Sequence, residues 1–374
     1  MRIRDAMEDT DRMDANALRT LAERYRNGDG VGKDPAEAVR LLTAASDMGD
    51  ADAASSLGYM LMVGEGVESD RAAAEVQLLR AADAGNPVAM SNLGVLLSMT
   101  DPGRSAEWFW KAADAGNLGA IRNLASMYAS GTGVPMDKPA AAELYRRGAD
   151  MGDNDSMCVL AAMLRNGDGV PMDKTGAAEL YRKAAEMGDP DAQYDLAFML
   201  DSGEGVPQDR PEAERLFRLS AEQGDTDACL CLGGILYERG EFAEAERWFM
   251  DAALKGDVKA SYNLGLMYTD GSLGEPDPSK AEEWFEAAAE QGFAYAQTMM
   301  GSLCLDRKDV AAAERWFSMA AEQGEPTSMY NLGAMALSGM IDMDERKTME
   351  YLTRAASAGI QEAGRLISAA LNNS

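Results

Sequence analysis

The sequence of 374 residues contains no histidine. Every mechanism that needs an imidazole base is therefore excluded, including Ser-His-Asp and Cys-His arrangements. Zinc sites that use histidine ligands are excluded as well. The four cysteines form no Cys-x-x-Cys pair and follow no regular spacing: Cys158, Cys229, Cys231 and Cys304. We expect reduced, packed thiols, with no metal and no bound cofactor.

Positive charge is scarce. Lysine and arginine number 35 against 63 aspartates and glutamates, which gives a formal net charge of −28. Such a chain repels phosphate backbones and anionic membrane surfaces, so we expect neither a nucleic-acid nor a membrane partner. No apolar stretch approaches the roughly 20 residues of a membrane span. Residues 1–9 lack the apolar segment of a signal peptide, which predicts a cytoplasmic protein.

An internal repeat runs along the chain. Aligning the segments that resemble Tyr262-Asn263-Leu264-Gly265 gives ten copies, spaced by 36, 36, 31, 36, 36, 36, 32, 36 and 32 residues. Each copy has Gly or Ala at the aligned position, where a small side chain indicates close contact between two helices. These positions are Ala22, Gly58, Gly94, Ala125, Ala161, Ala197, Gly233, Gly265, Gly301 and Gly333.

A second set of ten glycines closes the copies. Most of them are followed by Asp, Asn or Glu. Glycine supplies the left-handed conformation that ends a helix, and the acidic or amide side chain favours the start of the next one. The closing residues are Gly49, Gly85, Gly116, Gly152, Gly188, Gly224, Gly256, Gly292, Gly324 and Gly359.

Each copy therefore predicts a first helix (helix A), a loop, a second helix (helix B) and a glycine turn. In the sixth copy we expect helix A over about 191–202 and helix B over about 211–223. Five copies share a Gly-x-Gly-Val loop, as at 203–206, whereas the third, seventh and ninth copies have a shorter link.

The Gly-x-Gly-Val loop, the Leu-Gly pair of helix A and the aromatic-rich helix B resemble Sel1-like repeats, relatives of the tetratricopeptide repeat. The resemblance covers about 15–360. It implies a right-handed all-α solenoid (a superhelix) whose family members act mainly as protein-interaction adaptors.

Two apolar stripes are interpreted as core because they repeat at helical spacing. One is a methionine position in helix A of six copies, and the other is an aromatic pair in helix B. The methionines are Met60, Met127, Met163, Met199, Met267 and Met335. The pairs include Trp108-Phe109, Leu144-Tyr145, Leu180-Tyr181, Leu216-Phe217, Trp248-Phe249, Trp284-Phe285 and Trp316-Phe317.

Catalytic and ligand-binding interpretations find little support. The glycine loops lack the Lys-Ser/Thr of a phosphate loop and the acidic pattern of an EF-hand, so we interpret them as turns. No serine stands three residues before a lysine, as a β-lactamase-like motif requires. The many carboxylates leave a hydrolase open as a remote alternative. We expect no enzyme.

In related superhelices, helix A lines the concave face. Residues beside the packed Leu-Gly pair should then form a groove whose middle is polar and whose later part is aromatic. Tyrosine and arginine are favoured at binding hot spots. The predicted partner-binding residues are Arg122, Ser126, Arg165, Tyr194, Phe198, Asp201, Tyr237, Tyr262 and Tyr330. Part of the tyrosine row is also expected to serve packing between repeats.

We thus expect a charged segment at 1–14, one continuous solenoid of ten repeats at 15–360, and a C-terminal capping helix with its tail at 361–374. The favoured hypothesis is a scaffold that binds a protein or peptide, with a cationic partner surface, along the concave face. The alternative is a structural element that assembles with itself into a homo-oligomer.

Overall fold

The structure is a computed structural model that describes residues 13–373. Those residues form 21 helices joined by turns, with no strand among them. The prediction of an all-α solenoid of ten helix pairs and a C-terminal helix is confirmed. The predicted charged segment 1–14 lies outside the described residues except for Met13 and Asp14, and Asp14 caps the first helix.

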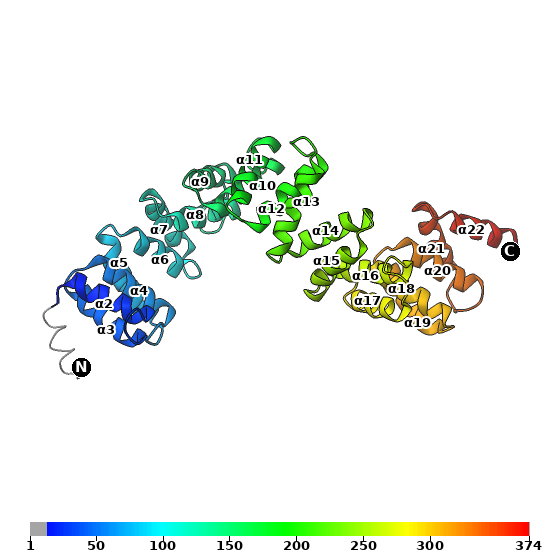
Figure 1. The fold of residues 1–374 in the computed structure, drawn as a ribbon, viewed down its shortest axis with the longest axis horizontal. Helices are drawn as coiled ribbons and strands as arrows, with labels where there is room; N and C mark the ends of the chain where they lie inside the picture. The colour runs from blue at the N-terminus through cyan, green and yellow to red at the C-terminus, as the bar shows by residue number, and fades with distance from the viewer. Residues whose placement is uncertain (1–12, 374) are drawn as a thin grey trace. The chain divides into compact units, whose positions relative to one another are not determined.

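The helices group into two compact units, 1–189 and 190–374. In the first unit each helix A packs on its own helix B, and each helix B before α11 also packs on helix A of the next pair (Figure 1). The A helices are α2 (Ala15–Asn27), α4 (Ala51–Val63), α6 (Pro87–Leu97), α8 (Leu118–Ser130) and α10 (Asn154–Asn166). The B helices are α3 (Pro35–Asp47), α5 (Arg71–Asp83), α7 (Pro102–Asp114), α9 (Lys138–Asp150) and α11 (Lys174–Glu186).

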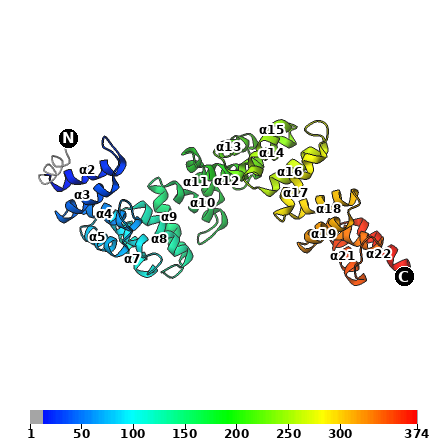
Figure 2. The same ribbon diagram turned by 90° about the horizontal axis from the view of Figure 1, so that it is seen from below.

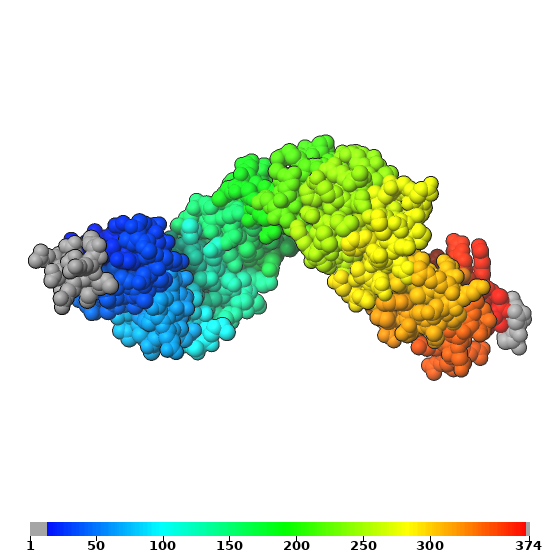
Figure 3. Space-filling view, turned by 60° about the horizontal axis from the view of Figure 1, so that its bottom comes forward, coloured from blue at the N-terminus to red at the C-terminus, as the bar shows by residue number. Residues whose placement is uncertain are grey.

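The second unit repeats this scheme and adds one helix. Figure 2 shows its pairs following one another in chain order, and in Figure 3 the colours succeed each other without mixing, so packing is between sequence neighbours. The A helices are α12 (Pro190–Ser202), α14 (Thr226–Glu238), α16 (Val258–Asp270), α18 (Ala294–Asp306) and α20 (Pro326–Leu337). The B helices are α13 (Arg210–Glu222), α15 (Phe242–Leu254), α17 (Pro278–Glu290), α19 (Val310–Glu322) and α21 (Glu345–Ser357). The last helix is α22 (Gln361–Asn373).

The turns between pairs form as their sequence predicts. All ten closing glycines have a positive φ, for example +94° at Gly256. The next residue, Asp257, accepts a hydrogen bond from the backbone N–H of Ala260 at 2.6 Å and so caps α16. One backbone conformation thus ends each pair, and a capping side chain starts most of the pairs that follow.

The core lies along the contact between helix A and helix B. At Gly265 an added Cβ would come within 2.5 Å of the ring of Phe285, which is itself buried. The six helix A methionines are buried, and so is the second residue of each helix B pair. The first residue of most pairs is only partly covered. Both stripes are therefore core, as predicted.

The C-terminal helix α22 packs on α20 and α21 through Ala363, Leu366 and Ile367. Its Leu371 stays 65% exposed. No described helix is both long enough and apolar enough to cross a membrane.

Candidate functional site

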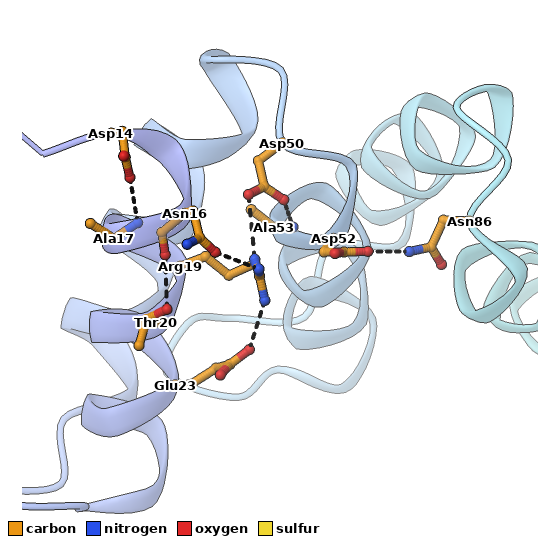
Figure 4. A network of polar contacts seen from close by, with 10 residues as sticks. All are labelled: Asp14, Asn16, Ala17, Arg19, Thr20, Glu23, Asp50, Asp52, Ala53 and Asn86. Carbon is orange, nitrogen blue, oxygen red and sulfur yellow. Dashed lines mark hydrogen bonds and ion pairs between the residues drawn. The ribbon is translucent and has the colours of Figure 1, made fainter.

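Where successive A helices meet, polar side chains of one repeat form hydrogen bonds or ion pairs with the residue that caps helix A of the next repeat. Figure 4 shows Arg19 of α2 between Asn16, Glu23 and Asp50, and its Nε lies 3.3 Å from Asp50 Oδ2. Asp50 is the N-cap of α4, so one carboxylate holds a helix start and a neighbouring repeat together. Asp52 likewise accepts from the amide of Asn86, the cap of α6, at 2.8 Å.

Arg122, a predicted binding residue, occupies the position equivalent to Arg19. Its guanidinium forms ion pairs with Asp153, at 3.6 Å, and with Asp155. Asp153 caps α10, so Arg122 belongs to the same kind of link between repeats. Its side chain is still 39% exposed, which leaves part of the fork open to a partner.

The other two predicted residues of the first unit lie on the same helices. Ser126 is exposed on α8 and lines a hollow of about 310 Å³ with Val95 and Ser98 of the preceding repeat. Arg165 is half-buried in the last turn of α10. There its positive charge complements the helix dipole.

The predicted tyrosines are half-buried, and the rings of Tyr194 and Tyr237 pack on helix B of their own repeat. The ring of Tyr194 lies 5.8 Å from that of Phe217, and Tyr237 meets Phe242 at 5.3 Å. Burial, with smaller contributions from the neighbouring Cys231 and from nearby carboxylates, raises the pKa of Tyr194 to about 12. The phenol O–H is hydrogen-bonded to the thiol of Cys231 on α14, in the next repeat.

Tyr262 forms a cluster of three rings with Phe293, at 5.4 Å, and Tyr295, at 6.3 Å. Phe293 stands where other A helices carry a capping acid or amide, and it makes no side-chain cap. Tyr295 is 57% exposed. Tyr330 packs against the C-terminal core. Tyr262 thus packs against the next repeat, as the sequence predicted for part of the tyrosine row.

A second hollow that predicted residues line lies between α12, α13 and α14. It has a volume of about 700 Å³ and is lined by Phe198 and Asp201, both predicted, and by ten residues that the sequence analysis did not single out as binding residues. Its apolar lining comes from Phe198, Pro211, Phe217, Leu230, Cys231, Gly234 and Ile235. We call this hollow the α12–α14 groove.

Ion pairs form the rim of the α12–α14 groove. Glu214 accepts from Arg239 at 2.8 Å and from Arg218 at 3.4 Å, and these hydrogen bonds hold the pKa of Glu214 below its usual value. Asp201 lies 3.7 Å from Arg210. The arginines of the rim are thus already engaged by carboxylates.

The recurring glycine loops pack against the preceding repeat. An added Cβ at Gly66 would lie 2.4 Å from the carbonyl of Pro35, and one at Gly133 would lie 2.3 Å from that of Pro102. Both glycines also have a positive φ. The second glycine of the loop is thus explained by close backbone approach, which supports its interpretation as a turn. Among residues 13–373 no group of three or more Cys, Asp or Glu is placed to hold a metal ion.

Comparison with known proteins identifies one family for most of the chain. The Sel1 repeat model matches nine segments of the chain: 15–50, 51–86, 87–117, 119–153, 154–189, 190–225, 258–293, 294–325 and 326–360. The stretch that contains the α14–α15 pair, 226–257, is left unmatched although it folds as a helix pair.

Three similar proteins illustrate the match. The crystal structure of a protective antigen from uropathogenic Escherichia coli strains, which displays an SLR fold, is 32% identical and has a TM-score of 0.83. That comparison covers 97% of this chain and 81% of the antigen. A Sel1 repeat protein from Oxalobacter formigenes is 26% identical, with a TM-score of 0.48, over 74% of this chain and 98% of that one. Chitin synthase regulatory factor 3 from Schizosaccharomyces pombe is 41% identical over 75 residues, which are 20% of this chain and 8% of that protein.

Proposed function

This chain belongs to the Sel1 repeat family, and we propose that it is a non-catalytic scaffold that binds a partner protein or peptide through the A-helix faces of its repeats. A Sel1 repeat scaffold is an architecture that suggests protein–protein interaction. The observation that carries the binding face is the α12–α14 groove, an apolar hollow of about 700 Å³ on helix A. Apolar hollows with a few convergent polar groups are the usual form of binding sites.

Within this proposal the nine predicted residues contribute unequally. Phe198 and Asp201 are the strongest candidates because they line the groove, where Phe198 is 43% exposed. Ser126 lines the smaller hollow of the first unit. Tyr194, Tyr237, Tyr262 and Tyr330 combine packing with an exposed edge, and Arg122 and Arg165 offer donors to carboxylates of the partner.

The test begins with the full chain, tagged and purified from its native source after chemical cross-linking. We expect mass spectrometry to identify a heterologous protein in stoichiometric amount, and calorimetry with the purified partner to give a dissociation constant. Phe198→Ala should weaken binding by about tenfold or more, as expected for a hot-spot aromatic. Leu254→Ala is the matched control, because Leu254 is a large apolar residue on α15 that is 74% exposed.

Two results would contradict the proposal. If Leu254→Ala abolishes binding and Phe198→Ala leaves it unchanged, the partner binds the B-helix face. If no partner is found and light scattering shows a mass that rises with protein concentration, the self-assembling alternative is favoured. Melting curves of both variants must match that of the parent chain.

A further inference from the structure

Two adjacent glycines in α14 have different surroundings. An added Cβ at Gly233 would lie 2.6 Å from the ring of Phe249, so helix packing requires a glycine there. An added Cβ at Gly234 would meet nothing within 4 Å, and the residue has no positive φ. A glycine inside a helix destabilises it by roughly 0.5–1 kcal/mol relative to alanine. The fold therefore gains nothing from Gly234.

The missing side chain at Gly234 opens the floor of the α12–α14 groove. The equivalent residue of the preceding repeat is Phe198 and that of the following repeat is Leu266, both large and apolar. Gly234 leaves open space where those two repeats place a side chain, and it lines the groove together with Phe198, Leu230 and Ile235. The gap lies in 226–257, the stretch that departs from the Sel1 pattern.

The charges around this gap favour a cation. Asp191 and Asp227 are exposed in the first turns of α12 and α14, and Glu238 borders the groove in the last turn of α14. The cations of the rim, Arg210 and Arg239, are paired with carboxylates.

The pKa of the Cys231 thiol is affected by the same carboxylates. Its pKa is raised to about 11, first by burial and then by the charges of carboxylates that include Asp227 and Asp201. Nearby negative charges disfavour a further negative charge at this position and favour a positive one.

We propose that the α12–α14 groove binds a partner segment that inserts one large apolar side chain over Gly234 and places a lysine or arginine beside Asp227. This inference rests on the proposed scaffold function and specifies its ligand. A second copy of this chain is a poor occupant, because two chains of net charge −28 repel each other.

The first experiment selects the ligand without assuming its sequence. A phage library of random dodecapeptides is panned against the full chain, and an enriched peptide is synthesised with a fluorescein label for anisotropy titration. We expect enriched peptides to carry Leu, Ile, Phe, Met or Trp within a few residues of Lys or Arg. Enrichment of acidic peptides, or of peptides without a large apolar residue, would overturn the proposal.

Gly234→Leu then tests the gap itself, because its side chain would occupy the space meant for the ligand. We expect this variant to bind the peptide at least about tenfold more weakly than the parent chain. The matched control is Gly364→Leu in α22, another helical glycine with open space around it, which should bind normally. Gly234→Ala is a second variant whose single methyl leaves the helix intact. It should melt at or above the parent temperature and still lower the affinity.

Asp227→Asn tests the cationic contact. It should weaken binding of the selected peptide several-fold, whereas the same variant should not change binding of a peptide in which Lys or Arg is replaced by Gln. Glu290→Gln, an exposed residue of α17, makes the same change in net charge outside the groove and should have no effect.

Several outcomes would overturn the groove assignment. The first is a folded Gly234→Leu variant that binds the peptide as tightly as the parent chain. The second is a dimer in light scattering that Gly234→Leu abolishes, because a second copy of the chain would then be the occupant of the groove. If a natural partner binds Gly234→Leu as tightly as the parent chain, this inference fails while the scaffold function stands. If no partner is found but the peptide results hold, the scaffold proposal fails and the groove remains a peptide site.

Discussion

At the residue scale, two kinds of A-helix glycine differ in what faces them. Gly58, Gly94, Gly233, Gly265, Gly301 and Gly333 face a helix B side chain at 2.6 Å or closer, whereas Gly234 faces open space. The first group sets how closely the two helices approach. A substitution should therefore have opposite consequences in the two groups.

We predict that Gly265→Leu destabilises the chain by about 3 kcal/mol or more, because the new side chain must displace Phe285 from a packed core. The free energy of unfolding from urea titration followed by circular dichroism measures this effect. Gly234→Leu is the matched control and should unfold near the parent midpoint. Equal urea midpoints for Gly265→Leu and the parent chain would show that the helices do not meet at Gly265.

A second prediction concerns the thiol in the groove. The pKa of Cys231 is raised from 9.0 to about 11, so at pH 8 its thiolate fraction is about a hundredfold lower than that of an unperturbed thiol. Iodoacetamide should label Cys231 slowly at pH 8 and faster as the pH approaches 11. Peptide mass spectrometry measures the rate, with the urea-unfolded chain as reference. Equal rates in the folded and unfolded chains at pH 8 would contradict this prediction.

At the element scale, the sequence predicted the helices well because their ends are encoded locally. In the sixth repeat the expected helices at 191–202 and 211–223 are observed as α12 (Pro190–Ser202) and α13 (Arg210–Glu222), so each end differs by at most one residue. A glycine turn recurs at each junction, most of the turns are followed by a capping Asp, Asn or Glu, and both signals act within a few residues of the chain.

The α12–α14 groove was harder to predict because it combines three helices and depends on a side chain that is absent. Phe198 and Asp201 were identified from their place in the repeat. Glu214 and Arg239 come from helix B and from the short link after α14, and nothing in their local sequence marks them as part of a groove. The one available signal was Gly234, a glycine at a position where other repeats carry a side chain.

Substitutions of the capping residue Asp50 should lower the free energy of unfolding by different amounts. Asp50 accepts from the backbone N–H of Ala53 at 2.8 Å and pairs with Arg19 at 3.3 Å. Asp50→Ala loses both interactions and should reduce the free energy of unfolding by about 1–2 kcal/mol. Asp50→Asn keeps a capping oxygen and should cost only a few tenths of a kcal/mol, since asparagine caps about as well as aspartate. Urea titration measures both values, and equal losses would show that the ion pair, rather than the cap, supplies the stabilisation.

At the scale of the whole molecule, the repeat explains why the kind of function could be predicted but the partner could not. Each helix pair packs on its neighbours through the same small and aromatic positions, so these residues specify the solenoid in every copy. Under the proposed scaffold function, we expect binding specificity to come from residues that differ between copies, such as Gly234 and Phe293. A single continuous solenoid over 15–360 stays a prediction, and the described contacts group into two units.

The net charge of −28 leads to a last prediction, about the rate at which a cationic peptide binds the groove. Long-range attraction speeds encounter and is screened within roughly 10 Å at 0.1 M salt, whereas the apolar contact over Gly234 does not depend on charge. Between about 50 and 500 mM NaCl the association rate should therefore fall by about tenfold, while the dissociation rate changes far less. Stopped-flow fluorescence with the labelled peptide measures both rates. The double variant Glu222→Gln and Asp251→Asn removes exposed charge from α13 and α15 and should lower only the association rate. If dissociation instead carries most of the salt dependence, the carboxylates act through direct contact with the ligand, and the charge of the whole molecule contributes little.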